Sequence, residues 1–180
     1  MSYSLYLVTY TRGTDWQTHR TKAYHWAFLI EIDHPKCIKH QLRGMPGGYY
    51  YPGPEDADAS NEEPGQEMKA TPAHQDTEPT PERPELADEE AETDGASAQL
   101  VVSKLEIGSI KNDKDTNVLQ EFEDACRKVY IEKDENKGGE GQWNCQKWCL
   151  EVLEELRAKG LGKDIWYGGT EIQEWLKEKA

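Results

Sequence analysis

The sequence has no apolar run close to the ~20 residues that a membrane-spanning helix requires. Its amino terminus, MSYSLYLVTYTRG, lacks the basic region and long apolar stretch of a signal peptide. We therefore expect no membrane span and no secretion. The four cysteines are then expected to be reduced thiols in the cytoplasm rather than a disulfide framework.

Large apolar residues are almost missing from residues 52–98, which contain no aromatic side chain. This segment holds fifteen acidic residues, two basic residues and seven of the nine prolines. Such a composition cannot bury enough apolar surface to offset the entropy lost on ordering the chain. The sequence therefore predicts a single domain over residues 1–180 with a disordered acidic insertion at 52–98. The insertion is either a solvated linker or a contact for a basic partner.

A basic surface is also lacking. Outside the insertion, 20 acidic residues stand against 19 basic ones, so most of the net charge of −14 belongs to residues 52–98. The nearly neutral remainder offers no basic face for nucleic acid, and we expect no nucleic-acid partner.

The remaining residues predict an α+β fold, a small antiparallel sheet packed on helices. Two strands, 25–32 and 38–44, are expected to form a hairpin around Pro35, and Gly108 is expected to mark a bulge. Asn144 and Thr170 are expected helix caps. The expected strands are 4–10, 25–32, 38–44 and 99–110, and the expected helices are 115–129, 144–160 and 170–179.

Cys145 follows the expected cap Asn144 and is therefore the first residue of its helix. Unpaired N–H groups and the positive end of the helix dipole favour an anion at this position, and helix starts lower thiol pKa values. The same N–H groups can stabilise an oxyanion. Cys145 also begins an apolar stripe with Trp148 and Cys149, so it can equally be a small core residue. Cys149, one turn later, is expected in the core.

A nucleophilic thiol needs a histidine as its base. His25 and His40 lie on the two strands of the expected hairpin, which can bring them side by side. One can act as base while the other orients it, as the third member of a catalytic triad does. Each can also be an ordinary hydrogen-bonded polar residue.

The run Tyr24-His25-Trp26-Ala27-Phe28, followed by His40 and then by Asn144-Cys145, resembles the permuted papain-like proteins. The resemblance is to the lecithin retinol acyltransferase-like branch of the NlpC-type superfamily. The chain is also similar to uncharacterised fungal proteins with a YHWA…NC-x-W pattern. This resemblance implies that Cys145 is the nucleophile, His25 the general base and His40 the orienting residue. The implied chemistry is acyl transfer from an amide or ester through a thioester, with no cofactor.

Three residues near these positions are candidates for binding a small-molecule or peptide acyl substrate. Arg43 follows the second hairpin strand and can bind an anionic group or form a surface ion pair. Tyr49 can line a cleft or cap the sheet edge, and Trp143 directly precedes Asn144-Cys145. No metal is expected, because His34, Cys37 and His40 supply three ligands without a fourth.

The alternative function is a non-catalytic protein-interaction module with the same fold. In that case the Cys145 thiol is buried, and the tyrosines and the acidic insertion serve a partner. Exposure and pKa of the thiol separate the two functions, because a catalytic thiol must be accessible and readily ionised.

Overall fold

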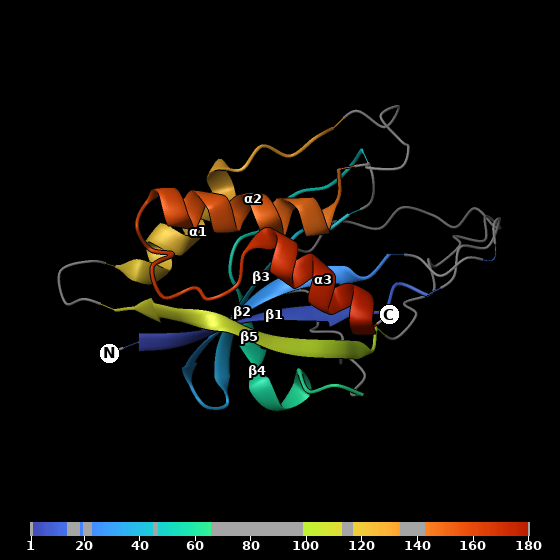
Figure 1. Cartoon of the computed structure of the whole chain (residues 1–180), viewed down its shortest axis with the longest axis horizontal. Helices are drawn as coiled ribbons and strands as arrows, with labels where there is room; N and C mark the ends of the chain where they lie inside the picture. Colours follow the sequence, from blue (N-terminus) through green and yellow to red (C-terminus); the bar gives the residue numbers. More distant parts are fainter. Residues whose placement is uncertain are drawn as a thin grey trace, which may run out of the picture.

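The computed structural model describes residues 2–13, 19, 23–44, 47–65, 99–112, 117–133 and 143–179 (Figure 1). Within these residues, five strands form one antiparallel sheet in the order β4-β3-β2-β1-β5. The strands are β1 (Ser2–Tyr10), β2 (His25–Asp33), β3 (Lys36–Gln41), β4 (Glu55–Asp58) and β5 (Val101–Lys111). Three α-helices follow the sheet in the sequence: α1 (Val118–Lys128), α2 (Cys145–Ala158) and α3 (Gly169–Lys179). The α+β prediction is confirmed.

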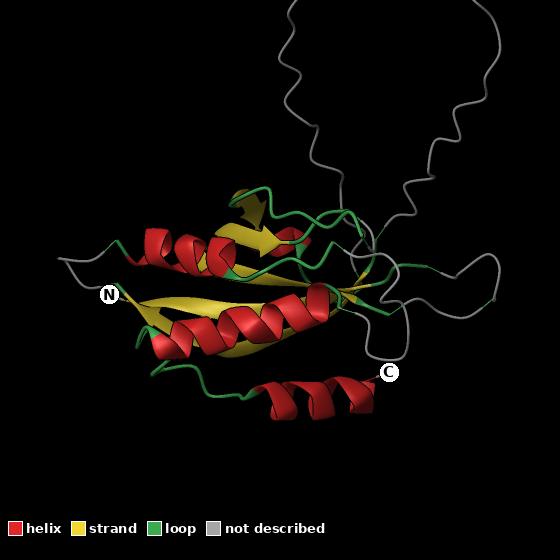
Figure 2. Ribbon diagram, turned by 90° about the horizontal axis from the view of Figure 1, so that it is seen from above, coloured by secondary structure: helices red, strands yellow, loops and turns green. Residues whose placement is uncertain are grey.

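Successive side chains of each strand point to opposite faces of the sheet, and the buried ones form a separate cluster on each face. On one face, residues of β1 and β2 pack against α1 and α2. Figure 2 shows α2 lying between α1 and α3 over this face. The main strand residues here are Leu5, Leu7, Trp26, Phe28 and Ile30, and the main helix residues are Phe122, Trp148, Cys149, Val152 and Leu153. None of the described helices is long and apolar enough to cross a membrane.

The other face holds a smaller cluster that includes Tyr10 and Leu29. The edge strand β4 contributes Ala57 to this cluster, and a 3-10 helix, η1 (Ala59–Asn61), contributes Ala59. After η1 the chain curls toward the opposite edge of the sheet, where the Gly65 N–H donates to the Val101 carbonyl at 2.9 Å. Beneath β4, the Lys39 ammonium and the Glu62 carboxylate form a buried ion pair, and the Tyr10 hydroxyl donates to Glu62 at 2.6 Å.

The predicted boundary of the insertion is therefore wrong at its start. Residues 55–61 form β4 and η1, and Glu62 lies in the core at 4% exposure. Pairing of β4 with β3 and the ion pair with Lys39 stabilise this segment without large apolar side chains. Residues 66–98 lie outside the described residues, and so does the prediction of disorder for them.

The bulge near Gly108 fastens the end of α2 to the sheet. Leu5 pairs with Gly108 and Tyr6 with Glu106, which leaves Ile107 as the extra residue. The chain after α2 crosses this point, with the Ser109 N–H bonded to the Asp164 carbonyl at 3.0 Å. A Cβ on Gly108 would collide with the backbone of Asp164 and Ile165. Glycine therefore allows this close approach.

Most helix and strand predictions agree with the structure within a few residues. Asn144 caps α2, and Gly160 follows its end with a positive φ of 76°. The cap predicted at Thr170 is wrong, because α3 already begins at Gly169. There the Glu171 carboxylate accepts from the Gly168 N–H at 2.6 Å, which satisfies a donor at the helix start.

Candidate functional site

Cys145 begins α2 at the point where this helix meets the start of β2. The Asn144 side chain accepts from the backbone N–H groups of Gln146 and Lys147 at 3.0 and 3.1 Å. The Gln146 amide donates to the Tyr24 carbonyl at 3.0 Å, and the Cys145 thiol contacts the same oxygen at 3.9 Å. The helix start is thus fastened to the backbone just before His25.

The sulfur of Cys145 lies level with His25 along β2. It contacts the Tyr24 carbonyl at 3.9 Å, and the Trp26 backbone N–H is one of the groups that lower the pKa of the thiol. In an extended strand, the carbonyl of one residue and the N–H two residues later point to the same edge. The sulfur therefore lies beside the edge of β2, between the two residues that flank His25.

Burial raises the pKa of the Cys145 thiol above its usual value. The side chain is only 1% exposed, and desolvation outweighs the N–H donors and the nearby positive charge of Arg12, which lower the pKa. The expectation that the helix start ionises this thiol is therefore wrong for the free protein. Cys149 is fully buried with a pKa raised much further, and its predicted place in the core is confirmed.

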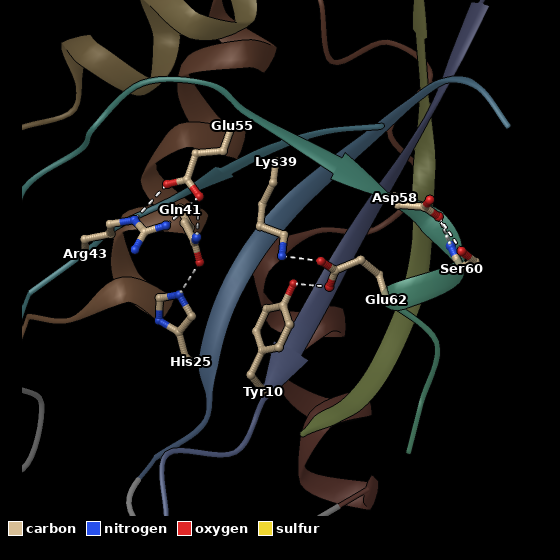
Figure 3. A network of polar contacts seen from close by, with 9 residues as sticks. All are labelled: Tyr10, His25, Lys39, Gln41, Arg43, Glu55, Asp58, Ser60 and Glu62. Atoms are coloured by element: carbon tan, nitrogen blue, oxygen red, sulfur yellow. Dashed lines mark hydrogen bonds and ion pairs between the residues drawn. The ribbon is translucent and has the colours of Figure 1, made fainter. Parts of the chain in front are cut away.

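His25 is the first residue of a chain of polar contacts on the sheet face of the smaller cluster (Figure 3). Its Nε2 lies 3.0 Å from Gln41 Oε1, and Gln41 Nε2 donates to Glu55 Oε2 at 3.0 Å. Arg43 holds the Glu55 carboxylate through two bonds of 2.9 and 2.8 Å. Each member of this chain fixes the position of the one before it.

The same contacts determine where the imidazole of His25 carries its proton. A carboxylate only accepts, so the amide nitrogen of Gln41 must face Glu55 and its carbonyl oxygen must face His25. The Nε2 atom then bears the hydrogen, and Nδ1 keeps its lone pair. Burial lowers the pKa of His25 to about 4, against the opposing effect of the Gln41 bond. At neutral pH, His25 is therefore an uncharged base with Nδ1 as its acceptor atom.

His40 lies on the opposite face of the sheet and does not meet His25. Phe28 pairs with His40, and His25 is three residues from Phe28, so the two histidines point to different sides. The His40 Nδ1 atom is 2.6 Å from the Tyr51 hydroxyl, and its ring centroid is 4.8 Å from that of Phe122. Burial lowers the pKa of His40 to about 4 as well.

The predicted role of His40 as the orienting residue is therefore wrong in this arrangement. Gln41, its neighbour in the sequence, occupies that position next to His25. Among the described residues, no hydrogen bond joins the Cys145 thiol to either histidine ring.

The three predicted substrate-binding residues separate into two groups. Tyr49 and Trp143 meet edge-on with centroids 6.0 Å apart, next to the start of α2. Tyr49 also accepts a bond from Arg12 Nη1 at 3.3 Å. Arg43 instead forms an ion pair at the surface, because both of its hydrogen bonds go to the Glu55 carboxylate rather than leaving it free for a substrate anion. The guanidinium charge that reaches the Cys145 thiol, and lowers its pKa, is that of Arg12.

The three residues with possible metal spacing do not assemble. Cys37 lies in the smaller cluster, His40 packs against Phe122 on the other face, and His34 is exposed at the turn. In the described part of the chain, no group of three or more His, Cys, Asp or Glu side chains could hold a metal ion.

Three residues of this site have no signal in the sequence that singles them out. Gln41 could have been found only from the register of the hairpin, which decides whether it or His40 shares a face with His25. Glu55 falls within the predicted acidic insertion, where its composition hides the strand β4. Arg12 follows a strand, and nothing in its neighbours marks it.

A family of unknown function (DUF6540) matches residues 87–163, which is less than half of the chain and includes α1 and α2. No curated protein and no solved structure matches the chain significantly. The function of the chain is therefore inferred from the geometry around Cys145 and His25.

Proposed function

We propose that this protein is a thiol-dependent acyl-transfer enzyme, an amide or ester hydrolase or an acyltransferase. Cys145 is the nucleophile, His25 the general base and Gln41 the residue that orients the base. The proposal includes a permuted papain-like fold for the chain. The observation that carries it is the contact of the sulfur with the Tyr24 carbonyl, one residue before an uncharged histidine whose Nε2 is held by an amide.

The proposed reaction has two stages. His25 Nδ1 takes the thiol proton as the sulfur attacks the substrate carbonyl. The new oxyanion faces the backbone N–H of Cys145, because the N–H groups of Gln146 and Lys147 already donate to the Asn144 side chain. The bond to the leaving amine or alcohol then breaks, and the leaving group receives the proton from His25. A water molecule or another acceptor attacks the resulting thioester, gives its proton to His25 and releases the acyl group, while the sulfur regains a proton.

The low pKa of His25 is compatible with this role because the base must be uncharged before each transfer. The resting thiol is protonated and donates to the Tyr24 carbonyl. Proton transfer must therefore accompany attack rather than precede it, and substrate must displace the contact between the thiol and that carbonyl.

One observation favours the second candidate, a non-catalytic interaction module. Cys145 is 1% exposed and its pKa is raised, as expected of a thiol that serves only as a core residue. Under this alternative, the contact chain from His25 to Arg43 holds β4 against the sheet and has no catalytic role.

Alkylation by iodoacetamide across pH, with mass spectrometry of each cysteine, separates the two functions. We expect Cys145 to react at least about tenfold faster than Cys149 in the folded protein and to lose this advantage in His25→Ala. His40→Phe is the matched control, because it removes a histidine of similar burial and pKa on the other face.

A second experiment tests acyl transfer directly: an activated 4-nitrophenyl ester should add one acyl group to Cys145. Equal, slow reaction of Cys145 and Cys149, with no acyl adduct, would contradict the enzymatic proposal.

A further inference from the structure

Arg12 lies two residues beyond the end of β1, at the end of the sheet where β2 and α2 begin. Its Nη1 atom donates to the Tyr49 hydroxyl at 3.3 Å, and Tyr49 is only 4% exposed. The Tyr49 ring in turn packs edge-on against Trp143. A buried phenol thus holds a partly exposed guanidinium, which has further N–H donors to offer.

The charge of Arg12 has different surroundings from those of the other arginines that the structure describes. In the described part of the chain, each of the three others binds a glutamate: Arg43 with Glu55, Arg127 with Glu123 and Arg157 with Glu154. Arg12 has no carboxylate partner among the described residues.

Arg12 is also close to both reacting groups. Tyr10, two residues before it, pairs with His25, and the rings of Tyr10 and His25 are 5.9 Å apart. Burial has the largest effect on the pKa values of Cys145 and His25, but the charge of Arg12 contributes to both. An anion bound by Arg12 would therefore lie near the thiol.

We propose that Arg12 determines the specificity of this site by binding a carboxylate on the acyl donor, with Tyr49 and Trp143 as the neighbouring wall. The inference rests on the proposed function and names its substrate class: acyl donors with a negative charge a few atoms from the reacting carbonyl. Guanidinium groups suit this task because their planar donors match a carboxylate in two-bond geometry.

Binding by Arg12 should act on KM more than on kcat. The carboxylate is remote from the bond that breaks, so the contact is similar in the ground state and the transition state. Loss of a charged hydrogen bond of this kind should raise KM for the anionic substrate by about 10- to 100-fold. A neutral substrate of the same length should be affected less than about threefold.

The test compares the mono-4-nitrophenyl ester of adipic acid with 4-nitrophenyl hexanoate, which has the same chain length without the carboxylate. Wild type, Arg12→Gln and Arg12→Lys are measured with both esters, and Lys36→Gln serves as a control for net charge at the far end of β3. We expect wild type to prefer the adipate ester, Arg12→Gln to lose the preference through KM, and Arg12→Lys to keep part of it. Calorimetric titration with monomethyl adipate in a Cys145→Ala background, with and without Arg12→Gln, measures binding without any reaction.

Each outcome decides between the two proposals. Equal use of both esters, or a preference that survives in Arg12→Gln, overturns the role of Arg12 and leaves the thiol enzyme intact. Hydrolysis of neither ester, with monomethyl adipate bound when Arg12 is present but not when it is changed to Gln, supports the anion site and removes the proposed enzymatic activity. Absence of both hydrolysis and binding overturns both.

Discussion

His25 and His40 lie on neighbouring strands, both are buried, and burial lowers the pKa of each to about 4. Their partners differ. His25 bonds to the amide of Gln41, whose orientation is fixed by Glu55, whereas His40 bonds to the hydroxyl of Tyr51 and packs against Phe122. An amide held in this way leaves one possible position for the imidazole proton, but a hydroxyl can donate or accept. Burial alone therefore does not distinguish a candidate base from a core histidine.

The two faces that hold these histidines also differ in what stabilises them. The His40 face is an apolar core formed by the sheet with α1 and α2. The His25 face depends on polar pairs that join β3 to β4 and η1, above all the buried pair of Lys39 and Glu62. Substitutions that remove a charge should therefore lower the free energy of unfolding far more on the His25 face than on the His40 face.

The largest expected effect comes from Glu62→Ala, which leaves the Lys39 ammonium buried without its partner. We expect a loss of about 3–5 kcal/mol in the free energy of unfolding, measured by urea denaturation. Glu63→Ala is the matched control: its carboxylate pairs with Lys104 but is 52% exposed, so its loss should cost less than about 1 kcal/mol. Similar losses for both variants would show that the polar pair does not hold this face.

Acid should destabilise the protein through both histidines. The pKa in the folded protein, about 4, lies below the ordinary value of 6.5, so the unfolded chain binds more protons between these pH values. The stabilising contribution is complete above pH 6.5 and is lost as pH falls toward 4, by roughly 3 kcal/mol for each histidine. Urea denaturation between pH 4.5 and 7 should show a shallower slope for His25→Gln and for His40→Phe, by about 1.4 kcal/mol per pH unit each. A variant with the wild-type slope would show that its histidine titrates normally in the folded state.

The smallest expected effect separates the two histidine partners. Gln41→Leu removes the bond that places the proton on His25 Nε2, so 15N NMR of the imidazole should show a mixture of tautomers. If the proposed function holds, kcat/KM should fall by about 10- to 100-fold with little change in KM. Tyr51→Phe removes the corresponding partner of His40 and should leave both the His25 tautomer and kcat/KM unchanged.

The elements that the sequence predicts well have a local physical cause. Alternating or continuous apolar residues define β1, β2 and β5, and α2 has an apolar stripe, a capping asparagine and a following glycine. These signals arise within a few residues, so they can be read without knowledge of the rest of the chain.

The parts that the sequence does not predict depend on distant contacts. Whether His40 or Gln41 faces His25 is set by a shift of one residue in the hairpin register, which moves every side chain to the other face. The strand β4 has the sequence Glu-Asp-Ala-Asp, and its stability comes from pairing with β3 and from Lys39, neither of which its composition reveals. The proximity of Arg12 to Tyr49 likewise follows only from the folded sheet.

Because Gly108 lets the chain after α2 pass close to β5, a change at this glycine can tilt the whole helix. The helix is fixed to the sheet beyond its carboxyl end, where the chain crosses Gly108, and Cys145 is at the other end, about 20 Å away at 1.5 Å per residue. A tilt of about 3° at the anchor would move the sulfur by roughly 1 Å, enough in enzymes to change rates about 100-fold. A methyl group added at Gly108 would thus be felt at the opposite end of α2, at the Cys145 thiol.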